Sequence, residues 1–164
     1  RFKKKKMGIT LDGIAKGYAV DKIAEFLEEK KFSNYLLNFS GNMRWKGHRP
    51  DQKARKIAIW NPILKSGLSL ELAAAGAIAS SGPEINFYSE DKRWHHIIDP
   101  KTLRPASLWA QTTVLGSDAQ ECDLLSTATF VMSEAQVIAV FKQHFPMNQV
   151  WVVENNGKQR RIFP

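Results

Sequence analysis

Hydrophobic and polar residues alternate in short runs over the first two thirds of the chain, which is the pattern of β-strands. The clearest runs are expected as strands over 34–39, 43–46, 56–60, 68–72 and 77–80. A weaker run predicts another strand over 7–11. Residues 86–89 and 93–98 are expected to pair as a hairpin around Glu90-Asp91-Lys92. This part of the chain is therefore expected to supply most of a sheet.

Apolar residues recur every three or four positions in three longer segments, which indicates helices. These segments are 18–30, 117–132 and 133–145. The last two begin with a capping box, Ser117 with Gln120 and Ser133 with Gln136. Three more strands are expected over 112–115, 150–153 and 160–163. Together these elements indicate an α+β fold, with a mostly antiparallel sheet and helices on one side.

Composition narrows the classes of protein that the chain can belong to. With 164 residues, 43% of them hydrophobic and 24% charged, it has the make-up of one globular domain and not of a disordered chain. No apolar run approaches the roughly 20 residues of a membrane-spanning helix, so no span is expected. The single cysteine, Cys122, excludes an internal disulfide and a cysteine-based zinc site.

The net charge of +8 favours an anionic partner such as a nucleotide or phosphate. The most basic run, residues 1–6, is interpreted as a solvated segment. Aromatic residues do not alternate with lysine and arginine as a stacking surface for nucleic acid requires. We therefore expect no nucleic-acid partner.

The first cluster that could carry chemistry is a turn rich in small residues, over 11–19, between a predicted strand and a helix. Backbone amides at a helix start favour an anion, and Lys16 adds a positive charge. The alternative is a tight turn with Lys16 in solvent.

The second cluster spans 94–100. In a strand His95 and His96 point to opposite faces, so they are poor joint metal ligands and only one can face a site. Asp99 precedes Pro100 and is expected to organise the turn there. The alternative is an ordinary strand end.

The third cluster lies in the helix predicted over 117–132, where Asp123 and Thr127 are four residues apart and share a face. A carboxylate and a hydroxyl are hard oxygen ligands of the kind Mg²⁺ accepts. Leu124, Leu125 and Phe130 are expected in the core on other faces. Alternatively, Asp123 complements the dipole of its own helix, and its loss would cost only about 0.3–1 kcal/mol. Thr127 would then bond back to the preceding turn.

Taken in order, the clusters resemble the ApbE family of FAD:protein FMN transferases, from about residue 7 to residue 153. The matching segments are Gly13 to Asp21, Asn38 to Asn42, Ser81-Gly82, His96 to Thr102 and Cys122 to Ala128. Two positions depart from the family pattern. Thr10 stands where the family usually has aspartate, and Leu103 where glycine usually follows the Asp-Pro-x-Thr signature.

The resemblance implies a T-fold-like α+β fold and Mg²⁺-dependent transfer of FMN from FAD to a Ser or Thr hydroxyl, with release of AMP. It implies metal ligands at Asp123, Thr127, the backbone carbonyl of Gly13 and, as a further candidate, Ser126. It implies contacts with the nucleotide or flavin at Lys16, His96, Ile97, Thr10, Gly41, Ser81 and Gly82. His96 would accept the hydroxyl proton, which makes His96 and Asp123 the catalytic candidates.

The resemblance also implies which part of the family's domain the chain represents, which acceptor it serves and where it acts. Residues 1–164 match the C-terminal part of the family's domain, so the chain is expected to hold the metal and phosphate side of the site without a complete FAD pocket. The acceptor would be a flavoprotein subunit of a membrane redox complex, in the periplasm or on the outer face of the bacterial inner membrane. Two alternatives stay open: an Mg²⁺-dependent FAD pyrophosphatase, in which water replaces the hydroxyl, and a non-catalytic flavin-binding or scaffold protein.

Overall fold

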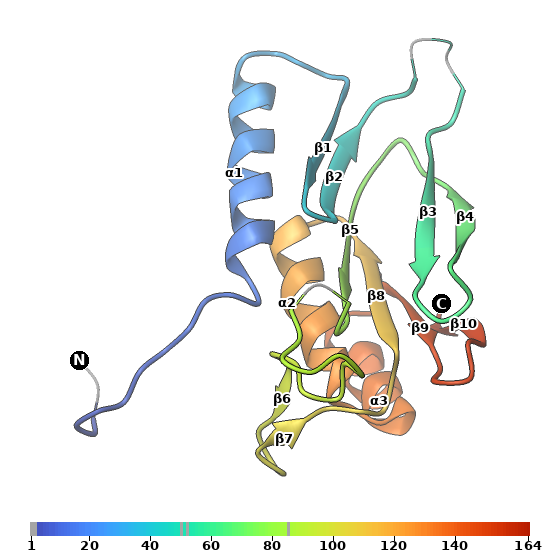
Figure 1. The fold of residues 1–164 in the computed structure, drawn as a ribbon. Helices are drawn as coiled ribbons and strands as arrows, with labels where there is room; N and C mark the ends of the chain where they lie inside the picture. Colours follow the sequence, from blue (N-terminus) through green and yellow to red (C-terminus); the bar gives the residue numbers. More distant parts are fainter. Residues whose placement is uncertain (1–2, 50, 52, 85) are drawn as a thin grey trace.

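A six-stranded antiparallel sheet forms the centre of the computed structural model, which describes residues 3–49, 51, 53–84 and 86–164 (Figure 1). Its strand order is β1-β2-β5-β8-β9-β10. The strands are β1 (Tyr35–Phe39), β2 (Asn42–Lys46), β5 (Ala75–Ser81), β8 (Gln111–Gly116), β9 (Gln149–Val153) and β10 (Gln159–Phe163). Arg1 and Phe2, which begin the basic run, lie outside the described residues.

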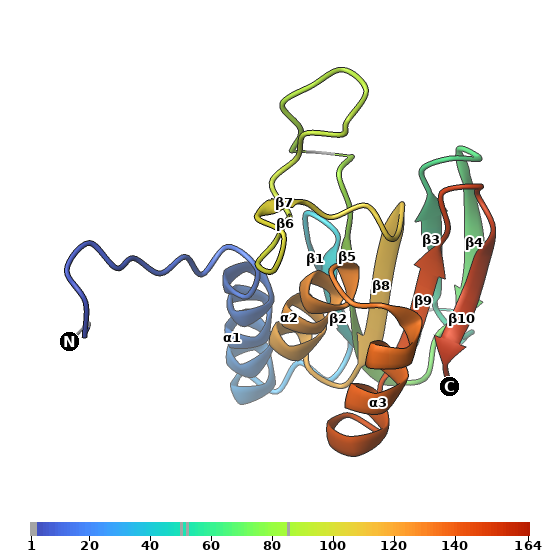
Figure 2. The ribbon, with the colours of Figure 1, turned by 90° about the horizontal axis from the view of Figure 1, so that it is seen from below.

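Three helices pack on one face of this sheet (Figure 2). They are α1 (Ala15–Glu29), α2 (Ala119–Phe130) and α3 (Glu134–His144). The core between them and the sheet is built from buried apolar side chains such as Val20, Val114, Leu125 and Phe141. The predicted α+β fold, with helices on one side of a mostly antiparallel sheet, is confirmed.

A two-stranded ribbon packs on the opposite face of the sheet, formed by β3 (Lys56–Asn61) and β4 (Ser66–Glu71). Trp45 and Ile78 of the sheet meet Ile59 of the ribbon in a second core. The ribbon is also tied to the sheet by the Asn61 side-chain amide, which donates to the Gly157 carbonyl at 2.9 Å. The helices and the ribbon thus sandwich the sheet.

The turn between β1 and β2 shows why the chain reverses there. Ser40 and Gly41 have φ angles of +52° and +93°, as the two-residue turns of tight hairpins require. The Asn38 side chain accepts a hydrogen bond from the Gly41 amide at 3.0 Å. The strands expected over 34–39 and 43–46 pair across this turn, with Phe39 opposite Asn42.

The strand predicted over 7–11 is wrong: these residues form no strand, and their apolar side chains Met7, Ile9 and Leu11 are exposed. The hairpin predicted over 86–98 forms only in part. The chain does reverse around Glu90-Asp91-Lys92, and the Tyr88 amide donates to the Trp94 carbonyl at 2.6 Å, but the pairing amounts to a single bridge between Phe87 and His95. An alternating pattern produces a strand only where a neighbouring strand can pair with it, and residues 7–11 pair with no strand among the described residues.

The short strands that follow are β6 (Ile98–Asp99) and β7 (Arg104–Pro105), which pair with each other. Asp99 organises the turn between them as predicted, because its carboxylate accepts the Lys101 amide at 2.8 Å. In the described part of the chain, no helix has both the length and the apolar character needed to cross a membrane.

The predicted caps are half right. The capping box of Ser133 and Gln136 at α3 is confirmed. At α2 the N-cap is Asp118 instead of Ser117, since Asp118 has an extended backbone and accepts the Glu121 amide at 2.8 Å. Leu124 is 46% exposed and was wrongly expected in the core.

Candidate functional site

Gly17 lets α1 approach α2 closely, Gly13 lies in the turn before α1, and two polar residues of α2 face these glycines. A Cβ atom on Gly17 would collide with the Ala119 carbonyl group, so only glycine fits at this crossing. Four residues earlier, a Cβ on Gly13 would lie 3.5 Å from the Thr127 side chain. The Gly17 amide donates to Asp123 Oδ2 at 2.9 Å. Gly13 therefore lies opposite Thr127, and Gly17 lies opposite Asp123.

Asp123 is a buried carboxylate with little compensation for its charge. Its side chain is buried, with 3% of the residue exposed, and its Oδ2 accepts the Gly17 amide. Among the described residues, the nearest cationic group is Lys16 Nζ, which lies 4.0 Å from Oδ1. The N-cap of α1 is Ile14, which has no polar side chain, so Asp123 serves as the cap that α1 lacks. Its second oxygen is left able to accept another donor or a cation.

Three hydroxyl groups meet one another beside the backbone carbonyl of Asp123. Ser81, the last residue of β5, lies 2.9 Å from Ser126 Oγ and 3.0 Å from Thr127 Oγ1. Ser126 and Thr127 each donate to the Asp123 carbonyl, as the alternative for Thr127 also expected. Residues from a strand, a helix and the turn before α1 thus bring several oxygen atoms together.

The donor set fits a hard cation. Carboxylate, hydroxyl and carbonyl oxygens are the ligands that Mg²⁺ prefers, and Mg²⁺ usually takes its remaining ligands from phosphate and water. Among the described residues no group of three or more His, Cys, Asp or Glu side chains could hold a metal by itself. A metal here would combine Asp123 with hydroxyl and carbonyl oxygens such as those of Thr127 and Gly13, and a bound phosphate and water would complete its ligands.

Lys16 is placed to meet such a phosphate. Its side chain is 43% exposed, and its Nζ lies near both Asp123 and the Asp12 carbonyl, at 4.0 Å and 3.4 Å. Of the amides at the start of α1, those of Ala15 and Gly17 already donate to the Leu11 carbonyl and to Asp123, so the Lys16 amide is the one placed to donate to an anion.

The two histidines have different environments. His95 is buried, with Nε2 2.9 Å from the Ala106 carbonyl and its ring packed edge-on against Phe130. Burial lowers the pKa of His95, so it is neutral at pH 7. His96 is exposed, and its Nδ1 lies 2.9 Å from the Asn86 carbonyl. The two rings therefore face in different directions, as predicted, although neither lies in a named strand.

The remaining predicted contacts are dispersed. Thr10 is exposed on the extended segment before α1, and Gly41 is exposed in the β1–β2 turn. The Ile97 side chain packs in the core with Trp109 and Val152. Gly82 follows Ser81, and a Cβ on it would lie 3.1 Å from the Ala110 carbonyl. The structure brings Gly13, Lys16, Ser81, Asp123, Ser126 and Thr127 together, with Gly82 next to Ser81, but it does not bring Thr10, Gly41 or Ile97 into this cluster.

Sequence reasoning missed two buried polar residues near the site. Asp21 is bound to the start of α2 and to Arg44. The Nδ2 of Asn42, which is 2% exposed, has no hydrogen-bond partner among the described residues. Asp21 is the last residue of the matching segment Gly13 to Asp21, and Asn42 is the last residue of Asn38 to Asn42. Their place in these segments was the signal that could have identified them.

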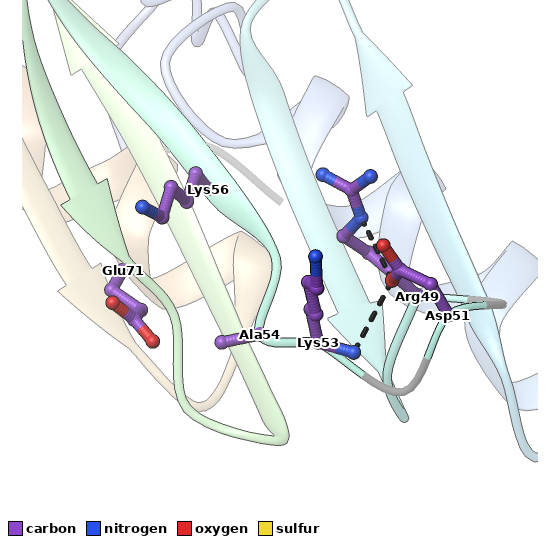
Figure 3. A pocket seen from close by; sticks show the side chains of 6 residues that line it. All are labelled: Arg49, Asp51, Lys53, Ala54, Lys56 and Glu71. Atoms are coloured by element: carbon purple, nitrogen blue, oxygen red, sulfur yellow. Dashed lines mark hydrogen bonds and ion pairs between the residues drawn. The ribbon is translucent and has the colours of Figure 1, made fainter.

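Two surface hollows lie outside this cluster. One, of about 410 Å³, is lined by charged residues around the loop before β3 (Figure 3). Its walls include Arg49 and Asp51, which pair with each other, together with Lys56 and Glu71. The other, of about 660 Å³, lies between the ribbon and the sheet near Trp45 and Trp151. Neither contains a residue of the predicted site.

Comparison with known proteins explains the arrangement. The sequence profile of the ApbE family matches residues 1–151, which is most of the chain. The chain belongs to the ApbE family. Curated relatives of this family include an FAD:protein FMN transferase of Vibrio cholerae, 36% identical over 136 residues, and one of Haemophilus influenzae, 35% identical over 141 residues. The matches cover 80% and 83% of this chain but 41% of each relative.

Solved ApbE structures share the fold. An ApbE protein of Thermotoga maritima superimposes with a TM-score of 0.82 at 30% identity, and the flavin transferase ApbE of Vibrio cholerae with a TM-score of 0.78 at 30% identity. Each match covers 93% of this chain and 50% of the solved chain. The chain thus spans about half the length of the solved ApbE proteins that it matches.

Proposed function

We propose that this chain supplies the metal and phosphate side of a site that transfers FMN from FAD to a Ser or Thr hydroxyl of an acceptor flavoprotein, with release of AMP. The observation that supports it is the oxygen cluster of Asp123, Thr127 and Ser81 beside Gly13. The relatives named FAD:protein FMN transferase favour this chemistry over other uses of such a cluster.

Some residues of the cluster would bind the metal, and others would bind the phosphate groups of FAD. Asp123 Oδ1, Thr127 Oγ1 and the Gly13 carbonyl would hold Mg²⁺, with Ser126 as a further candidate because its hydroxyl meets Ser81 at 2.9 Å. When bound, Mg²⁺ neutralises pyrophosphate charge and stabilises the leaving group. The side chain and the backbone amide of Lys16 would hold the phosphate oxygens.

His96 would take the proton of the acceptor. If Nδ1 donates to the Asn86 carbonyl, Nε2 carries the lone pair and is available as a base. The hydroxyl oxygen would attack the FMN phosphorus while the bond to the AMP oxygen breaks, and the hydroxyl proton would pass to His96. The electron pair of the broken bond leaves with AMP, so atoms and charge balance.

We also propose further contacts with FAD and a class of acceptor. We expect Thr10, Gly41, Ile97 and Gly82 to contact the nucleotide or flavin only when FAD is bound. We expect the acceptor to be a subunit of a membrane redox complex in the periplasm or on the outer face of the inner membrane.

The test is to incubate the protein with FAD, MgCl₂ and a candidate acceptor flavoprotein. Fluorescent flavin that remains on the acceptor after denaturing electrophoresis supports transfer. FMN and AMP without labelled acceptor would support an FAD pyrophosphatase instead. FAD binding without any product would support a non-catalytic flavin-binding protein.

A further inference from the structure

Beyond the contacts of Gly13 with Thr127 and of Gly17 with Asp123, a third contact joins α1 to α2, on the side of Gly17 away from Gly13. Asp21 is four residues after Gly17, and Ala119 is four residues before Asp123. The Ala119 amide donates to Asp21 Oδ1 at 3.1 Å, and the Gln120 amide donates to Asp21 Oδ2 at 2.8 Å. The pairs 13 with 127, 17 with 123 and 21 with 119 therefore follow one another at four-residue steps along antiparallel helices.

The two helices cap each other. Asp123 of α2 accepts an amide from the first turn of α1, and Asp21 of α1 accepts two amides from the first turn of α2. Amides in the first turn of a helix have no partner within the helix, so each carboxylate satisfies donors that burial would otherwise strand. The position of α2 along α1 is thus fixed by both carboxylates together.

Asp21 is itself buried and is held by a third donor. It is 4% exposed, and Arg44 of β2 donates to its Oδ1 at 2.5 Å. Three donors from α2 and β2 therefore converge on one buried carboxylate. An amide in its place has one oxygen and one NH₂ group, so it cannot accept all three.

We propose that Asp21 is a positioning residue: it sets the depth of α2 against α1 and so places Asp123 and Thr127 against Gly17 and Gly13. The consequence for the metal rests on the proposed function. A change in the Asp21 contacts would move the ligands without removing any of them.

The experiment compares Asp21→Asn with Glu121→Gln in the same protein. Each variant removes one carboxylate at the start of α2. Glutamine keeps the side-chain oxygen that accepts the Asn148 amide, so Glu121→Gln keeps that local bond, which involves no residue of α1. Only Asp21→Asn breaks the link between the helices. The first readout is the chemical shift and hydrogen-exchange protection of the Gly17 amide, measured by ¹H–¹⁵N NMR.

The second readout is the affinity for MgCl₂ in the presence of FAD, measured by isothermal titration calorimetry. We expect Asp21→Asn to shift the Gly17 amide, lower its protection and weaken Mg²⁺ binding roughly 10-fold, as loss of supporting groups around a metal usually does. Glu121→Gln should leave all three close to wild type. If Asp21→Asn does not fold, Asp21→Glu keeps the charge, lengthens the side chain and is measured in the same way.

The outcomes separate this inference from the proposed function. An unchanged Gly17 amide in a folded Asp21 variant overturns the positioning role, whatever the metal does. A displaced Gly17 amide in a protein whose wild type binds no Mg²⁺ with FAD leaves the positioning role standing and counts against the proposed function. Equal effects of the Asp21 and Glu121 variants would mean that charge at the start of α2, and not the link between the helices, is what matters.

Discussion

Replacing Asp123 by asparagine separates the two things that this carboxylate does in the structure. Oδ2 accepts the Gly17 amide and so caps α1, whereas Oδ1 has no nearer partner among the described residues than Lys16 Nζ at 4.0 Å. Asparagine keeps one oxygen for the Gly17 amide but loses the negative charge. Alanine loses both. The pair of variants therefore distinguishes a structural cap from a metal ligand.

The structure sets the sizes of these effects. A buried hydrogen bond to a charged group contributes about 1.5–3 kcal/mol, so Asp123→Ala should lower the free energy of unfolding by that amount. This exceeds the 0.3–1 kcal/mol expected from sequence, because the carboxylate caps a second helix and is not an exposed first-turn charge. Asp123→Asn should stay within about 1 kcal/mol of wild type, since the cap is kept.

The assays are urea unfolding and the Mg²⁺ dependence of FAD binding and FMN transfer. A metal supplies several kcal/mol of transition-state stabilisation, so its loss in Asp123→Asn should reduce the transfer rate by roughly 100-fold or more. Asp123→Asn with wild-type stability, wild-type Mg²⁺ dependence and normal transfer would show that Asp123 is a cap alone. The proposed metal site would then be refuted.

Three further changes test the structure around the site. Gly17→Ala should cost about 1–3 kcal/mol in urea unfolding, because its Cβ would collide with α2, whereas Gly8→Ala, in open space, should cost nothing comparable. Leu103 has a φ of +57° and is 78% exposed, so Leu103→Gly should raise the unfolding free energy by about 0.5–1 kcal/mol, and a loss of stability would contradict this. Burial lowers the pKa of His95, so the unfolded chain binds a proton that the folded chain does not. Stability should therefore fall below about pH 6.5, and a fall between pH 7.5 and 5.5 that is as large in His95→Gln would count against this origin.

The regular elements were largely predictable because their signals are local. The period of three to four in α1 and the capping box at Ser133 depend on residues close in sequence, and both predictions hold. Residues 7–11 alternate as a strand should, yet they form none. Alternation fixes which side chains share a face, but pairing requires a neighbouring strand that lies elsewhere in the chain.

The sequence by itself determined the family and the residue types of the candidate site, because the segments around Gly13, His96 and Asp123 keep their order and spacing. It could not show that Asp123 caps α1, that Asp21 caps α2, or that Ser81 meets Ser126 and Thr127. Those contacts join residues 45 or more positions apart. Only the close packing of α1, α2 and β5 brings them within hydrogen-bond distance, because short-range spacing carries no information about which elements meet.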